Sequence, residues 1–331
     1  MKNKRLEQDL TALTMVKKIL IRLAIELLQK KKVLNFLKTP QDLDTIAHNC
    51  KLKNKKMLEN ILDILVSEKI LKYKNGYYLP EKIKTIDTGK EEKFLKENYK
   101  ESLEWVVFVN EYSENTLTTG KPSKLTGFEE EKAVYYWNKI MEQSPYSLRA
   151  LAIKELYKDL KSKSVILDYG CGSGVGLEQL IELSEIPIKL IGTDPSKKFF
   201  VKAKNRLDNL NFKSKIKNKN KEDTILIDFK NLKYYKGKCD AVFTSLIFNH
   251  ISPVEYVKVF KKISSMLKPH GKFVIVQFLD FEKYNRNPIW VMHNIPSHVE
   301  YPMKYKFISD LKSVFPEVNE YLDGIITIST K

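Results

Sequence analysis

A glycine-rich turn between a predicted strand and a predicted helix is the feature that most constrains the fold of this chain. The segment from Asp168 to Gly176 reads DYGCGSGVG; it follows the apolar run 164–167 and opens a helical stretch at Val175. Glycine lets the backbone turn sharply and lets a ligand approach where any Cβ would intrude. In this strand–turn–helix context, the turn predicts a ligand site at the start of the helix.

Strands and helices are expected to alternate around this turn. The apolar runs expected to form strands are 164–168, 188–193, 224–227, 241–245 and 272–278. Helical stretches separate most of them, notably 175–183 and 254–267. This alternation predicts the α/β fold class, with a doubly wound parallel sheet covered by helices on both faces.

The spacing of the glycines indicates what kind of ligand the turn binds. Pyrophosphate-binding turns have the spacing G-x-G-x-x-G, which seats phosphates on the N-terminus of the helix. Here Gly170, Gly172 and Gly174 follow the pattern G-x-G-x-G, and Asp168 stands just before them. An acidic residue at this place suits a ligand with a positive amino group and no phosphate.

Two further carboxylates follow the next predicted strands. Asp194 ends the second strand, where a carboxylate can accept hydrogen bonds from both ribose hydroxyls of an adenosine. Asp228 and Phe229 follow the third strand, where a carboxylate can hold the adenine amino group and an aromatic ring can cover the base. Because the carboxyl ends of parallel strands share one edge of a sheet, these residues and Asp168 are expected along one crevice.

The first ninety residues show a different pattern, helical and then hairpin-like. The helices expected there are 13–28, 40–46 and 55–68. Thr39 is the expected N-cap of the second helix, with Pro40 at its first helical position. Two alternating runs joined by Asn75-Gly76 then predict a β-hairpin. Three helices followed by a hairpin predict an α-helical winged-helix domain over residues 1–90.

A winged helix either places its third helix in a DNA groove or serves as a packing and dimerisation module. Glu59 and Asp63 lie on the third helix, where acidic side chains disfavour contact with phosphates. A homodimer through the N-terminal domain is therefore favoured. A DNA-binding regulator that senses a small ligand remains the alternative. Residues 91–160 are expected to form a helical connector, followed by the α/β domain over 161–331.

Composition narrows the class of partner. The formal net charge is +17, but aromatic residues do not interleave with the lysines as a nucleic-acid stacking surface requires, so solvated faces are favoured over a nucleic-acid partner. The most apolar stretch, 19–28, is far shorter than the ~20 residues of a membrane span. With no apolar signal core at the N-terminus, a cytoplasmic protein is predicted. The three cysteines form no CxxC pair, so neither a disulfide framework nor a metal site is predicted.

Four segments carry a family resemblance. VILDYGCGSG, LIGTDPS, CDAVFTSL and LKPHGKFVIV resemble the successive motifs of Rossmann-like, S-adenosylmethionine-dependent methyltransferases over about residues 164–278. Upstream, LTTGKP from Leu117, then Phe128, then WNKIM from Trp137 resemble the small-molecule O-methyltransferases of plant phenolic and bacterial antibiotic pathways. The resemblance implies S-adenosylmethionine as cofactor and a winged helix that builds a homodimer. The cofactor-binding residues it implies are Asp168, Gly170, Gly172, Gly174, Asp194, Asp228, Phe229 and Ser245.

The expected catalytic base departs from the pattern of this family. The family places a histidine after the fourth strand, where this chain has Asn249, with His250 one position later. It also tends to carry a glutamate at the end of the fifth strand, where this chain has Gln277. Three interpretations stay open: His250 acts as base through a local shift, transfer needs no protein base, or the protein binds the cofactor but has lost transfer chemistry.

An apolar, aromatic-rich pocket is expected to receive the methyl acceptor. The residues predicted to line it are Trp105, Trp137, Met141 and Phe248, together with Trp290 and His293 from the long connection after the fifth strand. Such a lining suits a small, planar or lipid-like acceptor. Whether oxygen, carbon or nitrogen is methylated is left open.

Overall fold

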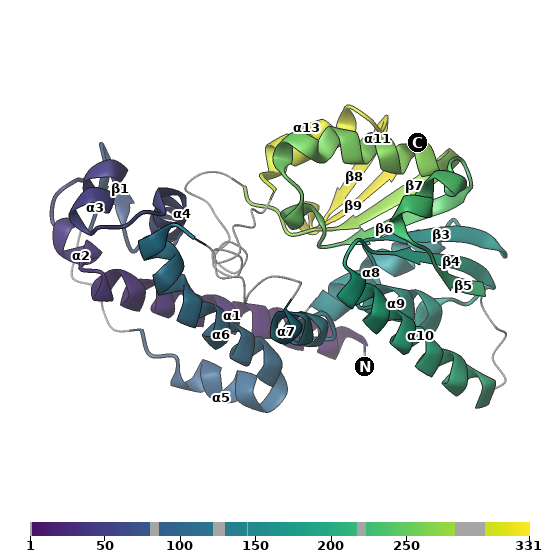
Figure 1. Cartoon of the computed structure of the whole chain (residues 1–331), viewed down its shortest axis with the longest axis horizontal. Coiled ribbons are helices and arrows are strands. Elements are labelled where there is room, and N and C mark those ends of the chain that lie inside the picture. Colours follow the sequence, from purple (N-terminus) through teal and green to yellow (C-terminus); the bar gives the residue numbers. More distant parts are fainter. Residues whose placement is uncertain (1, 80–85, 122–129, 144, 217–222, 282–301) are drawn as a thin grey trace. The chain divides into compact units, whose positions relative to one another are not determined.

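A computed structural model describes residues 2–79, 86–121, 130–143, 145–216, 223–281 and 302–331 (Figure 1). The chain divides into two compact units, Met1–Gln143 with Asp280–Met303, and Ser144–Leu279 with Lys304–Lys331. Each unit has its own apolar core. In the part of the chain that the structure describes, no helix is both long and apolar enough to cross a membrane.

The first unit begins with helices and a short hairpin. Its first elements are α1 (Lys2–Lys30), α2 (Val33–Phe36), α3 (Leu43–Asn49), α4 (Lys55–Ser67), β1 (Lys72–Tyr73) and β2 (Tyr77–Tyr78). The turn between the strands has Asn75 at φ 57° and Gly76 at φ 135°, the positive values that an Asn-Gly hairpin turn demands. The expected hairpin is therefore present.

The start of α3 differs from the prediction. Asp42, and not Thr39, is the N-cap, because its side chain accepts a hydrogen bond from the Thr45 N–H at 2.8 Å. Gln41 is held in an extended conformation by exchanging backbone hydrogen bonds with Tyr77 of the hairpin. A helix that included residues 40 and 41 would lose this pairing, so the helix begins three residues later than predicted, at Leu43.

Asp63 is buried, although the sequence predicted it on the exposed surface of the third helix. It lies on the buried face of α4, fully removed from solvent, and accepts a hydrogen bond from the Tyr77 hydroxyl at 2.6 Å. This carboxylate ties α4 to the hairpin, so it does not contribute an acidic surface to the third helix as the sequence argument assumed.

Three further helices carry an aromatic cluster in the first unit. They are α5 (Gly89–Asn98), α6 (Lys100–Thr119) and α7 (Glu131–Met141). Trp105 of α6 is 3% exposed, and its ring centroid lies 5.5 Å from that of Phe108 and 6.3 Å from that of Trp137 in α7. The cluster holds α6 and α7 together by apolar burial.

The second unit is built on a seven-stranded sheet of order β5-β4-β3-β6-β7-β9-β8. Its strands are β3 (Ser164–Tyr169), β4 (Ile188–Thr193), β5 (Asp223–Leu226), β6 (Cys239–Ser245), β7 (Leu267–Val276), β8 (Glu317–Tyr321) and β9 (Ile326–Thr330). Neighbouring strands from β5 to β7 pair in parallel, as predicted, whereas β8 and β9 form an antiparallel hairpin at the edge. The hairpin was not predicted from the sequence.

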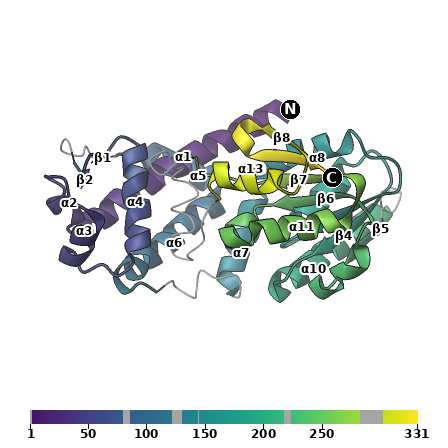
Figure 2. The ribbon, with the colours of Figure 1, turned by 90° about the horizontal axis from the view of Figure 1, so that it is seen from above.

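Helices cover both faces of this sheet, which confirms the expected α/β architecture. The helices and helical turns are α8 (Pro145–Tyr157), α9 (Val175–Leu183), α10 (Lys197–Ile216), η2 (Phe229–Tyr235), η3 (Phe248–His250), η4 (Pro253–Glu255), α11 (Tyr256–Met266), α13 (Lys304–Lys312) and η6 (Leu322–Gly324). Helices α11 and α13 lie on one face, and α8, α9 and α10 on the other (Figures 1 and 2). One apolar core of this unit includes Phe260 of α11 and Phe307 of α13.

Candidate functional site

The strand order places a crevice at the end of β3. The chain builds β4 and β5 on one side of β3 and then crosses to β6 and β7 on the other. The carboxyl ends of β3 and β6 therefore diverge into separate loops, and such a switch point is where open α/β sheets bind their ligands.

The glycine-rich turn follows β3 at this point. Gly170, Gly172 and Gly174 have φ values of 80°, 54° and 82°, a region that other residues enter only with strain. A Cβ added at Gly170 would lie 2.6 Å from Ile247 Cγ2, so the turn packs against the segment after β6. A Cβ at Gly172 would meet nothing within 4 Å, so this side of the turn is open.

Asp194 connects the end of β4 to the turn. Its Oδ2 accepts a hydrogen bond from the Gly172 N–H, and its Oδ1 accepts one from the Ser196 N–H, each at 2.8 Å. Burial raises the pKa of this carboxyl, and the two backbone hydrogen bonds oppose the rise. Each carboxylate oxygen can accept a further hydrogen bond, so the pair of ribose hydroxyls remains a suitable ligand.

Asp168 lies beneath the turn and is 2% exposed. Its Oδ2 has no hydrogen-bond partner among the described residues, and a Cβ at Gly176 in α9 would come within 2.8 Å of it. Burial raises the pKa of this carboxyl to about 7; the Arg149 charge opposes the rise and the Asp194 charge adds to it. A buried acceptor without a partner is costly, which suits a site completed by a cationic ligand.

The remaining predicted cofactor residues surround the same strand ends. Asp228 is exposed and caps η2, where its Oδ1 accepts a hydrogen bond from the Lys230 N–H at 3.0 Å. The Phe229 ring meets Tyr169 edge-on at 5.3 Å and lies 4.1 Å from Lys262 Nζ. Ser245 ends β6, and its buried hydroxyl oxygen has no partner within the described ranges. Their roles toward adenine and ribose remain predictions.

The two residues that depart from the family pattern are Asn249, after β6, and Gln277, at the end of β7. Asn249 is 2% exposed, and its Nδ2 lies 3.0 Å from His250 Nε2. Gln277 is fully buried; its Oε1 accepts a hydrogen bond from the Phe248 N–H at 3.0 Å, and its Nε2 donates to the Phe278 carbonyl oxygen at 3.2 Å. Gln277 thus joins the end of β7 to η3.

His250 has a weakly basic side chain. The side chain is accessible to solvent, but the protein packed around it disfavours the imidazolium and lowers the pKa of the ring to about 4. The imidazole is therefore neutral at pH 7 and is a weaker base than a free imidazole.

The predicted acceptor-pocket residues lie in several places. Trp105 is buried in the aromatic cluster of the first unit, with Trp137 and Met141 half-buried at its border. Phe248 is wholly buried in the core of the second unit, with its centroid 5.0 Å from that of Phe307, so its position does not support a pocket-lining role. Trp290 and His293 lie outside the described residues.

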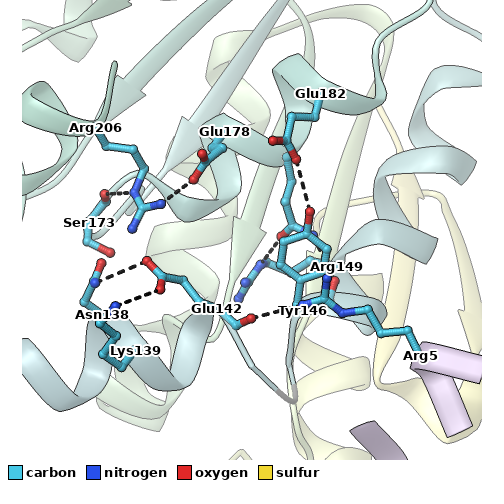
Figure 3. Close-up of polar contacts among 11 residues, drawn as sticks. Arg5, Asn138, Lys139, Glu142, Tyr146, Arg149, Ser173, Glu178, Glu182 and Arg206 are labelled. Carbon is cyan, nitrogen blue, oxygen red and sulfur yellow. Dashed lines mark hydrogen bonds and ion pairs between the residues drawn. The ribbon is translucent and has the colours of Figure 1, made fainter. Parts of the chain in front are cut away.

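Two arginines near the turn were not singled out from the sequence. Arg206 Nε donates to the Ser173 carbonyl oxygen at 3.0 Å, and its Nη1 pairs with Glu178 of α9, so it braces the turn from α10 (Figure 3). Arg149 of α8 is 1% exposed. A signal for Arg149 was present: it shares a helical face with the apolar residues Ala152 and Ile153, where a charged side chain needs an explanation.

Comparison with known proteins shows which proteins share this domain and this fold. Residues 166–271 match the model of a methyltransferase domain. Over the whole chain, the carbon methyltransferase CurJ is similar in structure, with a TM-score of 0.67 and 12% identity over 96% of this chain and 91% of that one. An O-methyltransferase family 2 protein from Planctomyces limnophilus, solved with apigenin, has a TM-score of 0.56 and 13% identity, over 98% of this chain and 94% of that one. Human N-acetylserotonin methyltransferase, solved with S-adenosylmethionine, has a TM-score of 0.51 and 16% identity, over 100% of this chain and 98% of that one. No curated protein sequence matches the chain.

The second unit therefore contains a methyltransferase domain with the Rossmann-like fold, as the sequence motifs predicted. The chain as a whole shares the fold of methyltransferases, one of which was solved with S-adenosylmethionine. Neither a DNA-binding regulator nor a cofactor-binding protein without transfer activity is favoured by these findings.

The residues at the turn fit this cofactor. S-adenosylmethionine carries an adenosine, a sulfonium and the ammonium and carboxylate of an amino acid, and has no phosphate. The open space at Gly172 leaves room for backbone contact, Asp194 presents acceptors for hydroxyl groups, and Asp168 presents a buried acceptor for a cation.

Proposed function

We propose that this chain methylates a small-molecule acceptor by in-line displacement, without a histidine of the protein as base. The cofactor, when bound, supplies an electrophilic methyl group on its sulfonium. The protein has to hold donor and acceptor in line and keep water away, and such alignment lowers a barrier by on the order of 7–11 kcal/mol. A positioned base would add roughly 10²–10⁴-fold.

The proposal that transfer needs no protein base rests on the buried side-chain amides of Asn249 and Gln277. Neither amide can take up a proton at neutral pH, and both polar atoms of Gln277 are engaged by backbone groups. With a pKa of about 4, His250 is also a poor proton acceptor. A suitable acceptor therefore has an acidic hydroxyl, a nucleophilic carbon or nitrogen, or its own proton-accepting group.

The class of acceptor is supported by the similar structures and by the aromatic residues of the first unit. The similar proteins include a carbon methyltransferase, an enzyme solved with apigenin and an N-acetylserotonin methyltransferase. We propose that Trp137 and Met141, which are half-buried, contact a planar or lipid-like acceptor.

The domain organisation is part of the same proposal. Residues 1–90 act as a winged-helix dimerisation domain, 91–160 contribute to acceptor binding, and 161–331 carry out transfer. The helices α3 and α4 with the β1–β2 hairpin support the first assignment.

Methyl transfer from labelled S-adenosylmethionine to apigenin, to N-acetylserotonin and to a 1,3-dicarbonyl compound, which has an acidic carbon, tests the chemistry. We expect transfer to at least one of them, and we expect His250→Ala to keep turnover within about threefold, because the imidazole removes no proton. Asp194→Ala serves as the matched control that abolishes cofactor binding. A loss of 100-fold or more in His250→Ala, with cofactor affinity unchanged, would restore His250 as the base.

A further inference from the structure

The segment that follows β4 bonds to two adjacent residues of the glycine turn. Asp194, just after the strand, accepts a hydrogen bond from the Gly172 N–H at 2.8 Å. Arg206, on α10, donates from its Nε to the carbonyl oxygen of Ser173 at 3.0 Å. Ser173 is itself buried, and a buried backbone carbonyl needs a partner. The segment 194–206 thus satisfies a backbone donor and a backbone acceptor of the turn.

The turn also packs directly against α10. A Cβ added at Gly174 would lie 3.1 Å from Ala203 Cα and 3.5 Å from Arg206 Cδ. The guanidinium of Arg206 also forms an ion pair through its Nη1 with the carboxylate of Glu178 on α9 (Figure 3). Both side chains of this pair are half-buried, which limits screening by water. Arg206 therefore connects the turn to α9 and to α10 at once.

A turn built on glycines depends on such outside contacts for its order. Gly170, Gly172 and Gly174 all have positive φ values, and glycine loses more conformational freedom on ordering than any other residue. Fixing the backbone of one residue costs on the order of tenfold in an equilibrium constant. If the turn were loose before binding, the cofactor would have to order it and would bind more weakly. A contact that orders the turn beforehand therefore raises cofactor affinity.

We propose that Arg206 is a positioning residue of the cofactor site, which keeps the turn in its ligand-binding conformation through the carbonyl oxygen of Ser173. The inference rests on cofactor binding at the glycine turn and is independent of the acceptor. The guanidinium suits this role because one nitrogen bonds to the turn while another bonds to Glu178. A lysine has a single ammonium group and no second nitrogen for the turn.

Hydrogen exchange of the ligand-free full chain, followed by NMR, tests whether Arg206 orders the turn. The amides of Gly172 and Gly174 report on it, because they donate to Asp194 Oδ2 and to the Cys171 carbonyl oxygen. We expect Arg206→Met to speed the exchange of both amides at least tenfold and to leave the amides of β6 at their natural rates. Faster exchange in β6 to the same degree would show a merely structural arginine and would overturn the proposal.

Calorimetry with S-adenosylhomocysteine tests the consequence for binding. We expect Arg206→Met to weaken binding at least tenfold, and Arg206→Lys to weaken it at least fivefold although it keeps a cation beside Glu178. Lys202→Met is the matched control: it removes a cation from an exposed position of the same helix, and it should leave the affinity and both amide rates within twofold. The thermal midpoints of all three variants should stay within about 5 °C of that of the natural chain.

Arg206→Lys keeps the proposal testable if Arg206→Met fails to fold. Full affinity in Arg206→Lys would show that only the charge beside Glu178 matters, and unchanged amide exchange in either variant would show that the turn is ordered without the arginine; each result would overturn the proposal. If the natural chain binds no S-adenosylhomocysteine, the cofactor site itself is wrong, and the inference falls with it.

Discussion

The carboxyl group of Asp168 is under two opposing influences, burial and the nearby charge of Arg149. Its pKa of about 7 in the folded chain is above the usual 3.8, so the folded state binds the proton more tightly than the unfolded state does. This tighter proton binding stabilises the folded state. The stabilisation is complete at pH values below the pKa of Asp168 in the unfolded chain, decreases as the pH rises above about 4, and is lost once the pH passes about 7. Over this window it amounts to up to about 4 kcal/mol.

Asp168→Asn should remove this pH dependence. We expect the thermal stability of the ligand-free natural chain to fall between pH 4.5 and 7.5 relative to that of Asp168→Asn, because only the carboxyl has to ionise inside the protein. Thermal unfolding followed by circular dichroism across this range measures the difference. Parallel curves for the two chains would mean that the carboxyl is not buried as the structure places it. Cofactor affinity should fall at least tenfold in the variant.

At the scale of elements, the contact between α9 and β3 makes a glycine necessary inside a helix. Gly176 has ordinary helical backbone angles, so its lack of a side chain is needed for space: an added Cβ would lie 2.8 Å from Asp168 Oδ2 and 3.7 Å from Phe243 Cε1. Alanine would improve helix propensity by about 1 kcal/mol, but the short Asp168 side chain would have to move.

Gly176→Ala should therefore weaken S-adenosylhomocysteine binding by about tenfold or more while changing the free energy of unfolding by less than about 2 kcal/mol. Calorimetry and denaturant unfolding give the two values. Gly89→Ala is a matched control, since that glycine begins α5 and its added Cβ would make only an ordinary 3.4 Å contact with Asp87. Unchanged cofactor affinity in Gly176→Ala would contradict the tight packing of α9 on Asp168.

At the scale of the whole molecule, cofactor binding and dimerisation are proposed for different units. The glycine turn, Asp168 and Asp194 all lie in the second unit, and the proposed dimerisation helices lie in the first. Each unit has its own buried core, and the core under α11 and α13 includes Phe248, Phe260 and Phe307. Cofactor binding should therefore be separable from association.

Sedimentation of the full chain and of residues 144–331 tests this separation. We expect the full chain to sediment as a dimer, and the shorter chain to sediment as a monomer that binds S-adenosylhomocysteine within about tenfold of the full chain. Retained dimerisation in the folded shorter chain would place the interface outside the first 143 residues. A folded shorter chain that binds no cofactor would show that residues 1–143 are needed for cofactor binding.

Local patterns determined a large part of this protein before any contact was known. The parallel strands, the glycine turn and the Asn75-Gly76 hairpin were predicted because each depends on backbone conformation and on the periodicity of a short segment. The same holds for the departures at Asn249 and Gln277, which follow from register along the chain. The positions of Asp168 and Asp194 at one edge follow from the parallel order of the strands.

Only the tertiary structure decided which polar groups are buried and what they contact. Thr39 loses its predicted role because Gln41 pairs with a strand far along the chain, and Asp63 turns inward to meet Tyr77. The hydrogen bond between Arg149 of α8 and Gln179 of α9 joins residues from two elements that no local pattern relates. Electrostatic effects depend on distance in space and on exclusion of water, and both are set by packing between elements remote in sequence.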